Sequence, residues 1–143
     1  MKVLTVEAHI DNLNAVMDFV RNDIVHNHCS PELLHNICLA VEEIFTNVAN
    51  YAYQPASGNV TVSIAIGAEA VIRFEDTGCP YNPLEHPQPD LGKPLMERDI
   101  GGLGVFLVKK MMDKIEYSRV DGKNVLVVTK KLTEPPTQNC EEN

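Results

Sequence analysis

Several residue types are scarce in this 143-residue sequence, and each scarcity narrows the class of protein. There is no tryptophan, and aromatic residues make up only 6% of the chain. No apolar run approaches the length needed to cross a membrane, and no signal-peptide pattern opens the chain. The four cysteines show no CxxC or other ligand-like spacing, which is typical of free thiols in a reducing compartment. We therefore expect a cytoplasmic protein with no membrane contact.

Basic residues are also in the minority. Twelve Lys and Arg stand against twenty Asp and Glu, which gives a formal net charge of −8. This balance argues against a basic patch of the kind that binds nucleic acid, so we expect no direct nucleic-acid partner. The five histidines are scattered, and none has the spacing of a zinc pair. The length is sufficient for one domain with a buried core.

The most informative stretch is residues 31–53, which the sequence predicts to be a helix. Ser30 supplies an N-cap hydroxyl, Pro31 suits the first helical position, and Glu32 favours the positive end of the helix dipole. Apolar residues then recur at helical spacing and predict a wide buried stripe. These are Leu34, Ile37, Cys38, Val41, Ile44, Phe45, Val48, Ala49 and Ala52.

A polar line interrupts this apolar helix. Glu43, Asn47 and Asn50 are spaced i, i+4 and i+7, so they fall on one side. For an arbitrary helix, the commoner interpretation is that such residues face water or bond the local backbone. The sharper hypothesis is a metal–phosphate site, in which the Asn47 amide oxygen binds Mg²⁺ and Glu43 accepts a proton from a nucleophile.

The remaining pattern predicts an α+β protein. Period-two alternation and turn signals predict strands, apolar periodicity predicts two more helices, and a proline-rich stretch predicts a mobile lid. The strands are expected at 2–8, 59–66, 70–76, 114–120 and 124–132, the helices at 11–28 and 105–113, and the lid from 77 to 101. We expect one domain over residues 1–132, a flexible tail over 133–143, and a two-layer sandwich. Its sheet is mixed but mostly antiparallel, with the helices on one face.

Two further motifs are compatible with nucleotide binding. Asp76 ends an apolar strand, where a carboxylate can accept a hydrogen bond from an exocyclic amine, and Gly78 permits close backbone approach. Gly102-Leu103-Gly104 opens an apolar segment and offers backbone N–H groups to phosphates. Each motif alone also fits an ordinary turn or hinge. Neither the P-loop ending nor the Rossmann fingerprint is present.

The combination resembles a known family. The segments EEIFTNVANYAY, EDTGCPYNP and DIGGLGVFLVKKMMDKIEY are similar to the ATP-binding domain shared by gyrase, the heat-shock chaperone, histidine kinases and MutL. Within that family they resemble the small bacterial anti-sigma factor serine kinases, over roughly residues 3–132. The resemblance implies a histidine-kinase-like ATPase fold that binds ATP and Mg²⁺.

The resemblance also implies roles for individual residues. Glu43 matches the general base, Asn47 the Mg²⁺ ligand, and Tyr51 an aromatic beside the nucleotide. Asp76 matches the aspartate that reads adenine, and Gly78 its partner glycine. The positions expected near the phosphates are Asn50, Arg98, Gly102, Leu103 and Gly104. Asn50 departs from the histidine or lysine that many relatives carry there, and Tyr81-Asn82 replaces the commoner Phe-Asp.

The expected function is a serine/threonine protein kinase that phosphorylates an anti-sigma factor antagonist and sequesters a sigma factor by partner switching. If water replaces the partner's serine, the protein is a slow ATPase. Two alternatives remain: a nucleotide-gated binding module with no protein substrate, and a detached histidine-kinase catalytic domain. The resemblance also suggests a homodimer, for which the first strand and the first helix offer a contact surface.

Overall fold

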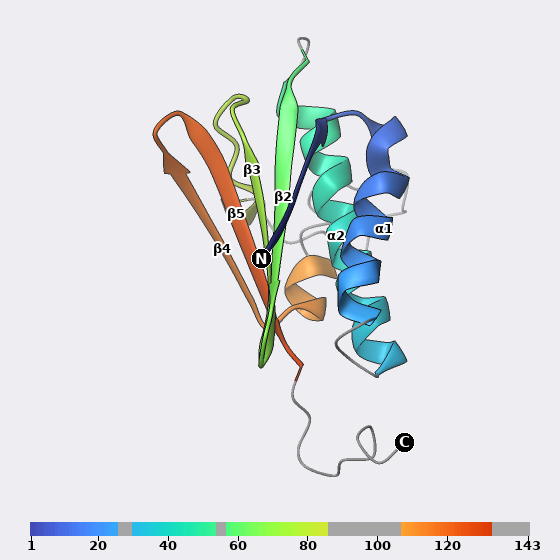
Figure 1. Ribbon diagram of the computed structural model, residues 1–143. Coiled ribbons are helices and arrows are strands. Elements are labelled where there is room, and N and C mark those ends of the chain that lie inside the picture. Colours follow the sequence, from blue (N-terminus) through green and yellow to red (C-terminus); the bar gives the residue numbers. More distant parts are fainter. Residues whose placement is uncertain (26–29, 54–56, 86–106, 133–143) are drawn as a thin grey trace, which may run out of the picture.

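The computed structural model describes residues 1–25, 30–53, 57–85 and 107–132. Five strands form one sheet, in the order β1-β2-β3-β5-β4, and each neighbouring pair is antiparallel. Two long helices, α1 (Leu13–Val25) and α2 (Pro31–Tyr51), cover one face of this sheet (Figure 1). The strands are β1 (Lys2–Glu7), β2 (Asn59–Ile66), β3 (Glu69–Asp76), β4 (Lys114–Val120) and β5 (Lys123–Lys131). The expected two-layer α+β architecture is confirmed.

Local sequence explains where both long helices begin. The Leu33 N–H donates to Ser30 Oγ at 3.3 Å, and Pro31 occupies the first turn, as the sequence predicts. Helix α1 begins at Leu13 and not at residue 11 as predicted, because a short 3-10 turn, η1 (Ile10–Asn12), precedes it. There the Asp11 N–H donates to His9 Nδ1 at 3.0 Å, so the chain uses a histidine as the cap.

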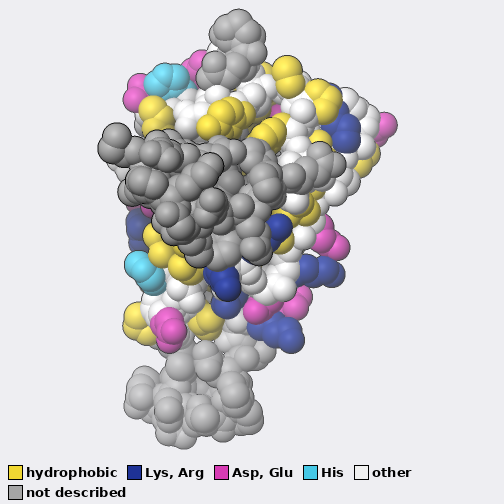
Figure 2. All heavy atoms as spheres, turned by 180° about the vertical axis from the view of Figure 1, so that it is seen from behind, with side chains coloured by type: hydrophobic (Ala, Val, Ile, Leu, Met, Phe, Trp, Pro, Cys, Tyr) yellow, Lys and Arg dark blue, Asp and Glu magenta, His cyan; other side chains and the backbone are white. Residues whose placement is uncertain are grey.

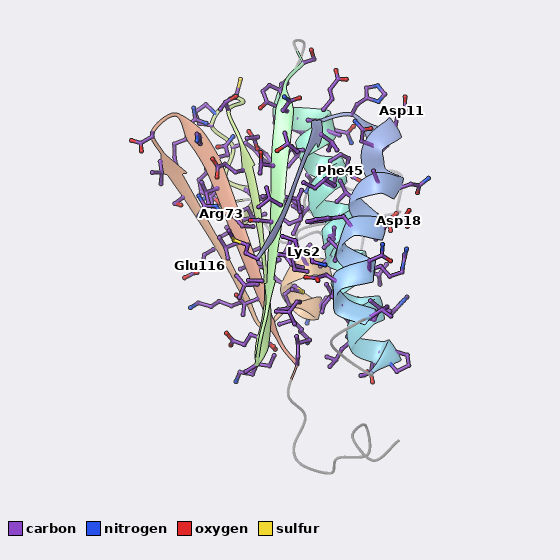
Figure 3. All side chains as sticks on the ribbon, viewed as in Figure 1. Lys2, Asp11, Asp18, Phe45, Arg73 and Glu116 are labelled. Atoms are coloured by element: carbon purple, nitrogen blue, oxygen red, sulfur yellow. The ribbon has the colours of Figure 1, made fainter. Side chains whose placement is uncertain are left out.

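The core lies between the helices and the sheet. Strands β2 and β3 alternate buried and more exposed positions, so every second side chain faces the helices. Phe45, on α2, is fully buried and lies in this layer (Figure 3). The inward residues of the two central strands are Val60, Val62, Ile64, Ala70, Ile72 and Phe74, and each is at most 1% exposed.

The outer face of the sheet is charged and carries both signs. Arg73 and Glu116 lie on the side away from the helices (Figure 3). Glu75 contacts two bases there, Arg73 at 3.1 Å and Lys123 at 2.8 Å. Figure 2, seen from behind, shows basic and acidic side chains interspersed along this side of the molecule. No helix in the described ranges is long and apolar enough to cross a membrane.

Tight turns set the strand register. Asp121 and Gly122 both have positive φ, at 53° and 78°, which suits the two-residue hairpin that joins β4 to β5. On its other side β5 pairs with β3, and there Asp76, the last residue of β3, pairs with Asn124, the second residue of β5. Two polar residues that are 48 positions apart in the sequence therefore meet at one end of the sheet.

Parts of the expected lid and of the third helix lie outside the described residues. Within the lid, residues 77–85 are described and include a short 3-10 turn, η2 (Pro83–Glu85). Of the helix predicted over 105–113, residues 107–111 are described and helical, on the same side of the sheet as α2 (Figure 1). Four candidate residues and the tail lie outside the described ranges, namely Arg98, Gly102, Leu103, Gly104 and residues 133–143.

Candidate functional site

A cavity opens at the end of the sheet where β3 ends and β5 begins. It encloses about 530 Å³ not filled by protein atoms, including open solvent at its mouth. Its described wall is mainly apolar, with a few polar groups converging on it. The apolar lining consists of Ile44, Val48, Ala52, Phe74, Pro83, Val108, Ile115 and Leu126, and the polar lining of Asn47, Asp76, Tyr81, Tyr117 and Asn124. Such a composition suits a largely apolar ligand with a few hydrogen-bonding groups.

Asp76 is the charged group of this cavity, and only 6% of it is exposed. Its Oδ1 accepts two hydrogen bonds, from the Gly78 N–H at 2.8 Å and from Asn124 Nδ2 at 2.9 Å. Its Oδ2 accepts none from the part of the chain that the structure describes. A buried carboxylate oxygen without a donor is costly. The cavity is therefore suited to a ligand that presents an N–H group, such as the exocyclic amine of adenine.

Asn124 holds this carboxylate in place. Its Nδ2 donates to Asp76 Oδ1 and to the Cys79 carbonyl at 2.8 Å. Its Oδ1 accepts the Tyr117 O–H at 2.5 Å and the Tyr81 N–H at 3.3 Å. Both donors and both acceptor positions of the amide are thus occupied. Neither Asn124 nor Tyr117 was predicted from the sequence. The available signal was a polar residue two positions from an inward apolar one, since Tyr117 follows Ile115 and Asn124 precedes Leu126.

The turn after Asp76 is held from several directions. The Cys79 N–H donates to the Ala52 carbonyl at 2.8 Å, and the Thr77 N–H donates to the Tyr53 hydroxyl at 2.9 Å. Arg119, on β4, donates to the Gly78 carbonyl at 2.8 Å. These bonds connect the turn to the end of α2 and to the sheet, so the carboxylate is anchored by rigid elements.

Gly78 allows a close approach to Ala52, and not the approach to a bound base that was expected. From the sequence, its backbone was expected to approach a bound base. In the structure, a Cβ at this position would lie 2.1 Å from the Ala52 carbonyl oxygen. Real Cβ atoms essentially never come so near to a backbone oxygen. The approach that the structure shows is therefore between the turn and the C-terminal end of α2.

The three polar residues of α2 differ in their surroundings. Asn47 lines the cavity with Asp76, as expected of residues from one site. Glu43, one turn earlier, is half-buried, and burial raises the pKa of its carboxyl group, with a further contribution from the neighbouring Glu42. Asn50 is exposed and is not part of the described cavity wall. The structure thus brings Asn47 to Asp76, while the expected role of Asn50 stays a prediction.

Two tyrosines stack beside the cavity. The rings of Tyr51 and Tyr81 have centroids 5.8 Å apart and an interplanar angle of 25°. Tyr81 lines the cavity, and Tyr51 is 43% exposed. Tyr51 was singled out by resemblance, whereas its partner Tyr81 was noted only as a departure from the usual motif.

In the described ranges no cluster of three or more His, Cys, Asp or Glu could hold a metal. A metal ion in the cavity would therefore be bound by oxygens such as that of the Asn47 side chain and by oxygens of the molecule bound beside it.

The sequence matches a known domain family over most of its length. The description "Histidine kinase-like ATPase domain" matches residues 6–130. The chain is 30% identical over 120 residues to the serine-protein kinase RsbW of Listeria monocytogenes, covering 80% of this chain and 74% of that protein. It is 28% identical over 103 residues to the serine/threonine-protein kinase BtrW of Bordetella bronchiseptica, covering 70% and 72%.

Solved structures share the fold. The RsbU and RsbW domains of a Mycobacterium tuberculosis protein align with a TM-score of 0.62 and 14% identity, over 94% of this chain. This chain spans 34% of that longer chain. The histidine kinase domain of a blue-light activated kinase from Erythrobacter litoralis aligns with a TM-score of 0.55 and 18% identity, over 84% of this chain and 61% of the other. From its sequence and fold alike, the chain belongs to the family of histidine kinase-like ATPase domains.

Proposed function

We propose that this protein binds Mg-ATP in the cavity and transfers the γ-phosphoryl group to a serine or threonine of a protein partner. The observation that carries the proposal is that Asp76 Oδ2 has no donor among the described residues, at the wall of a mainly apolar cavity. An adenine ring would bury its faces against the apolar wall while its exocyclic amine satisfies this oxygen. The relatives named as serine-protein kinases support the reaction type.

The residues of α2 suit the phosphate end of the nucleotide. Asn47 lines the cavity and offers an amide oxygen, a ligand type that Mg²⁺ accepts. Bound Mg²⁺ would supply charge neutralisation at the phosphates. The phosphate-binding positions Gly102, Leu103 and Gly104, together with Arg98 and Asn50, complete the proposed site.

Glu43 is the proposed general base. It lies one turn from Asn47 on α2, so both side chains project from the same side of the helix. Its raised pKa makes the carboxylate a better proton acceptor than an ordinary exposed glutamate. In this role it takes the proton from the attacking hydroxyl. Pure nucleotide binding would not require such a group.

The partners are proposed from the resemblance of the sequence to the anti-sigma factor serine kinases. The phosphoryl acceptor would be a small anti-sigma factor antagonist, and the protein would restrain a sigma factor when it is not bound to the antagonist. The nucleotide state would decide between the partners. A cytoplasmic location and a homodimer, with β1 and α1 as the contact surface, are part of the same proposal.

The proposal is tested by incubating the protein with labelled ATP, Mg²⁺ and a candidate antagonist. We expect label to appear on a serine or threonine of the antagonist. Label on a histidine of the protein itself would indicate a histidine kinase. Tight ATP binding with no transfer to any antagonist would indicate a nucleotide-gated binding module and would overturn the kinase assignment.

A further inference from the structure

The polar network behind Asp76 is centred on Asn124, to which the proposed function assigns no role. Asn124 is 6% exposed, lies on β5 opposite Asp76, and lines the cavity. A buried amide that makes four hydrogen bonds to four different groups fixes the position of each of them. Three of those groups lie close together in the sequence: Asp76 ends β3, and Cys79 and Tyr81 lie in the segment that follows it.

The orientation of the Asn124 amide is determined by its partners. One side of the amide faces a carboxylate and a carbonyl, which only accept hydrogen bonds, so the NH₂ group must lie there. The other side faces the backbone N–H of Tyr81, which only donates, so the oxygen must lie there. The Tyr117 hydroxyl then acts as a donor, at 2.5 Å.

The two oxygens of Asp76 differ in their hydrogen bonds. Oδ1 is saturated by Asn124 and the Gly78 N–H, whereas Oδ2 has no donor among the described residues. Because the hydrogen-bonding positions of Asn124 are all taken by protein, Asn124 has no donor left for a ligand. Asn124 therefore acts on a ligand through the groups that it holds, and among these Asp76 is the one that offers an acceptor oxygen to an amine.

We propose that Asn124 is a positioning residue for base selectivity: it holds Asp76 by Oδ1, so that Oδ2 alone reads the exocyclic amine. This inference rests on the proposed function, since it assumes an adenine nucleotide in the cavity. Tyr117 acts behind Asn124, because its hydroxyl holds the amide oxygen. Selectivity is thus set by a chain of contacts from β4 through β5 to β3.

The test compares two nucleotides that differ only in the amine. Dissociation constants of the full chain for Mg-ATP and for the Mg complex of purine riboside triphosphate, which lacks the 6-amino group, are measured by calorimetry. Their ratio reports the amine contact and cancels any general loss of binding. We expect the unaltered protein to favour ATP by about 10-fold to 100-fold, as for one hydrogen bond to a buried charged group.

Asn124→Asp keeps the shape and the acceptor oxygen but removes both N–H donors. We expect its ratio to fall toward one at neutral pH and to recover partly on acidification, because a protonated carboxyl can again donate to Oδ1. Tyr117→Phe keeps the ring and should give an intermediate ratio. Thr129→Val is the matched control, since Thr129 is also buried on β5 but does not line the cavity, and it should keep the original ratio.

The outcomes separate this inference from the proposed function. If the unaltered protein binds both nucleotides equally, the adenine assignment itself is wrong. If it prefers ATP and Asn124→Asp weakens both nucleotides by the same factor, Asn124 is only structural and the inference is overturned. Should Asn124→Asp fail to fold, Tyr117→Phe decides, because an unchanged ratio in that variant contradicts the proposed chain of contacts.

Discussion

At the scale of single residues, the carboxylates of this protein differ through their surroundings. Glu43 is half-buried beside another acid, which raises the pKa of its carboxyl group. Glu75 lies between two bases on the outer face, where the hydrogen bond from Lys123 above all lowers the pKa of its carboxyl group. The Glu43 carboxylate binds a proton more tightly than an ordinary glutamate, as suits a general base. The Glu75 carboxyl group loses its proton more readily, as suits a structural ion pair.

Glu43→Gln should remove most phosphoryl transfer while leaving ATP bound, because the amide cannot take a proton. A general base is typically worth about 10²–10⁴ in rate. Single-turnover transfer and the dissociation constant of Mg-ATP measure the two effects separately. Glu42→Gln is the matched control, since Glu42 is the exposed neighbour on the same helix and should change the rate only a few-fold. Equal rates in both variants would remove Glu43 from the mechanism.

Glu75→Gln should lower stability at neutral pH by about 0.5 kcal/mol, in the range of partly exposed ion pairs. Because the folded-state pKa of Glu75 is depressed, its contribution is present above the ordinary glutamate pKa. That contribution disappears as the pH falls through the depressed value. Urea unfolding of both proteins across this acidic range should therefore converge. Glu116→Gln, at an exposed pair 3.6 Å long, should change little at any pH.

At the scale of elements, Tyr53 is one of the residues that join the end of α2 to the sheet. The Tyr53 hydroxyl donates to the Asn59 carbonyl at 2.6 Å and accepts the Thr77 N–H at 2.9 Å. It therefore connects α2 to the start of β2 and to the turn after β3. The helix that carries Asn47 and the turn that anchors Asp76 are held together at this point.

Tyr53→Phe should loosen this connection while keeping the ring. We expect a loss of about 1–2 kcal/mol in the free energy of unfolding, because a backbone N–H and a carbonyl lose their partner. ATP affinity should also fall by a few-fold. Tyr51→Phe is the control for stability, because no described residue bonds the Tyr51 hydroxyl, and it should unfold like the original protein. Identical stability of the two variants would contradict the role of Tyr53.

Most elements could be predicted from the sequence because their signals are local. The Ser30-Pro31 start, the alternation in 59–66 and the Asp121-Gly122 turn each act within a few residues, and each is confirmed. The contacts of Asn124 could not be predicted in this way, because they depend on the pairing of β3 with β5. For Gly78 the sequence indicated a close approach but not its partner, which is a carbonyl on a distant helix.

At the scale of the whole molecule, ligand binding and stability are linked. Asp76 carries an unsatisfied oxygen in the described structure, and a bound nucleotide would satisfy it. The cavity is formed by α2, β3, β4 and β5 together, so a ligand there would hold several elements against one another. Binding to the folded state alone would then raise the temperature of unfolding.

Mg-ATP should therefore stabilise the full chain, and Mg-GTP should do so much less. At a concentration of 100 times the dissociation constant, the expected stabilisation is about 2.7 kcal/mol. A thermal unfolding series with each nucleotide, and with Mg²⁺ alone as the control, measures the difference. Equal shifts with ATP and GTP would contradict the assignment of Asp76 to the adenine amine.

The position of β1 has a practical consequence for handling the protein. This strand forms the sheet edge opposite β4, and none of its residues contributes to the cavity wall. Met1, just before it, is 88% exposed. A tether attached at Met1 would immobilise the molecule on a sensor surface without obstructing the described part of the mouth. Kinetic titrations with successive nucleotides could then be run on one captured sample.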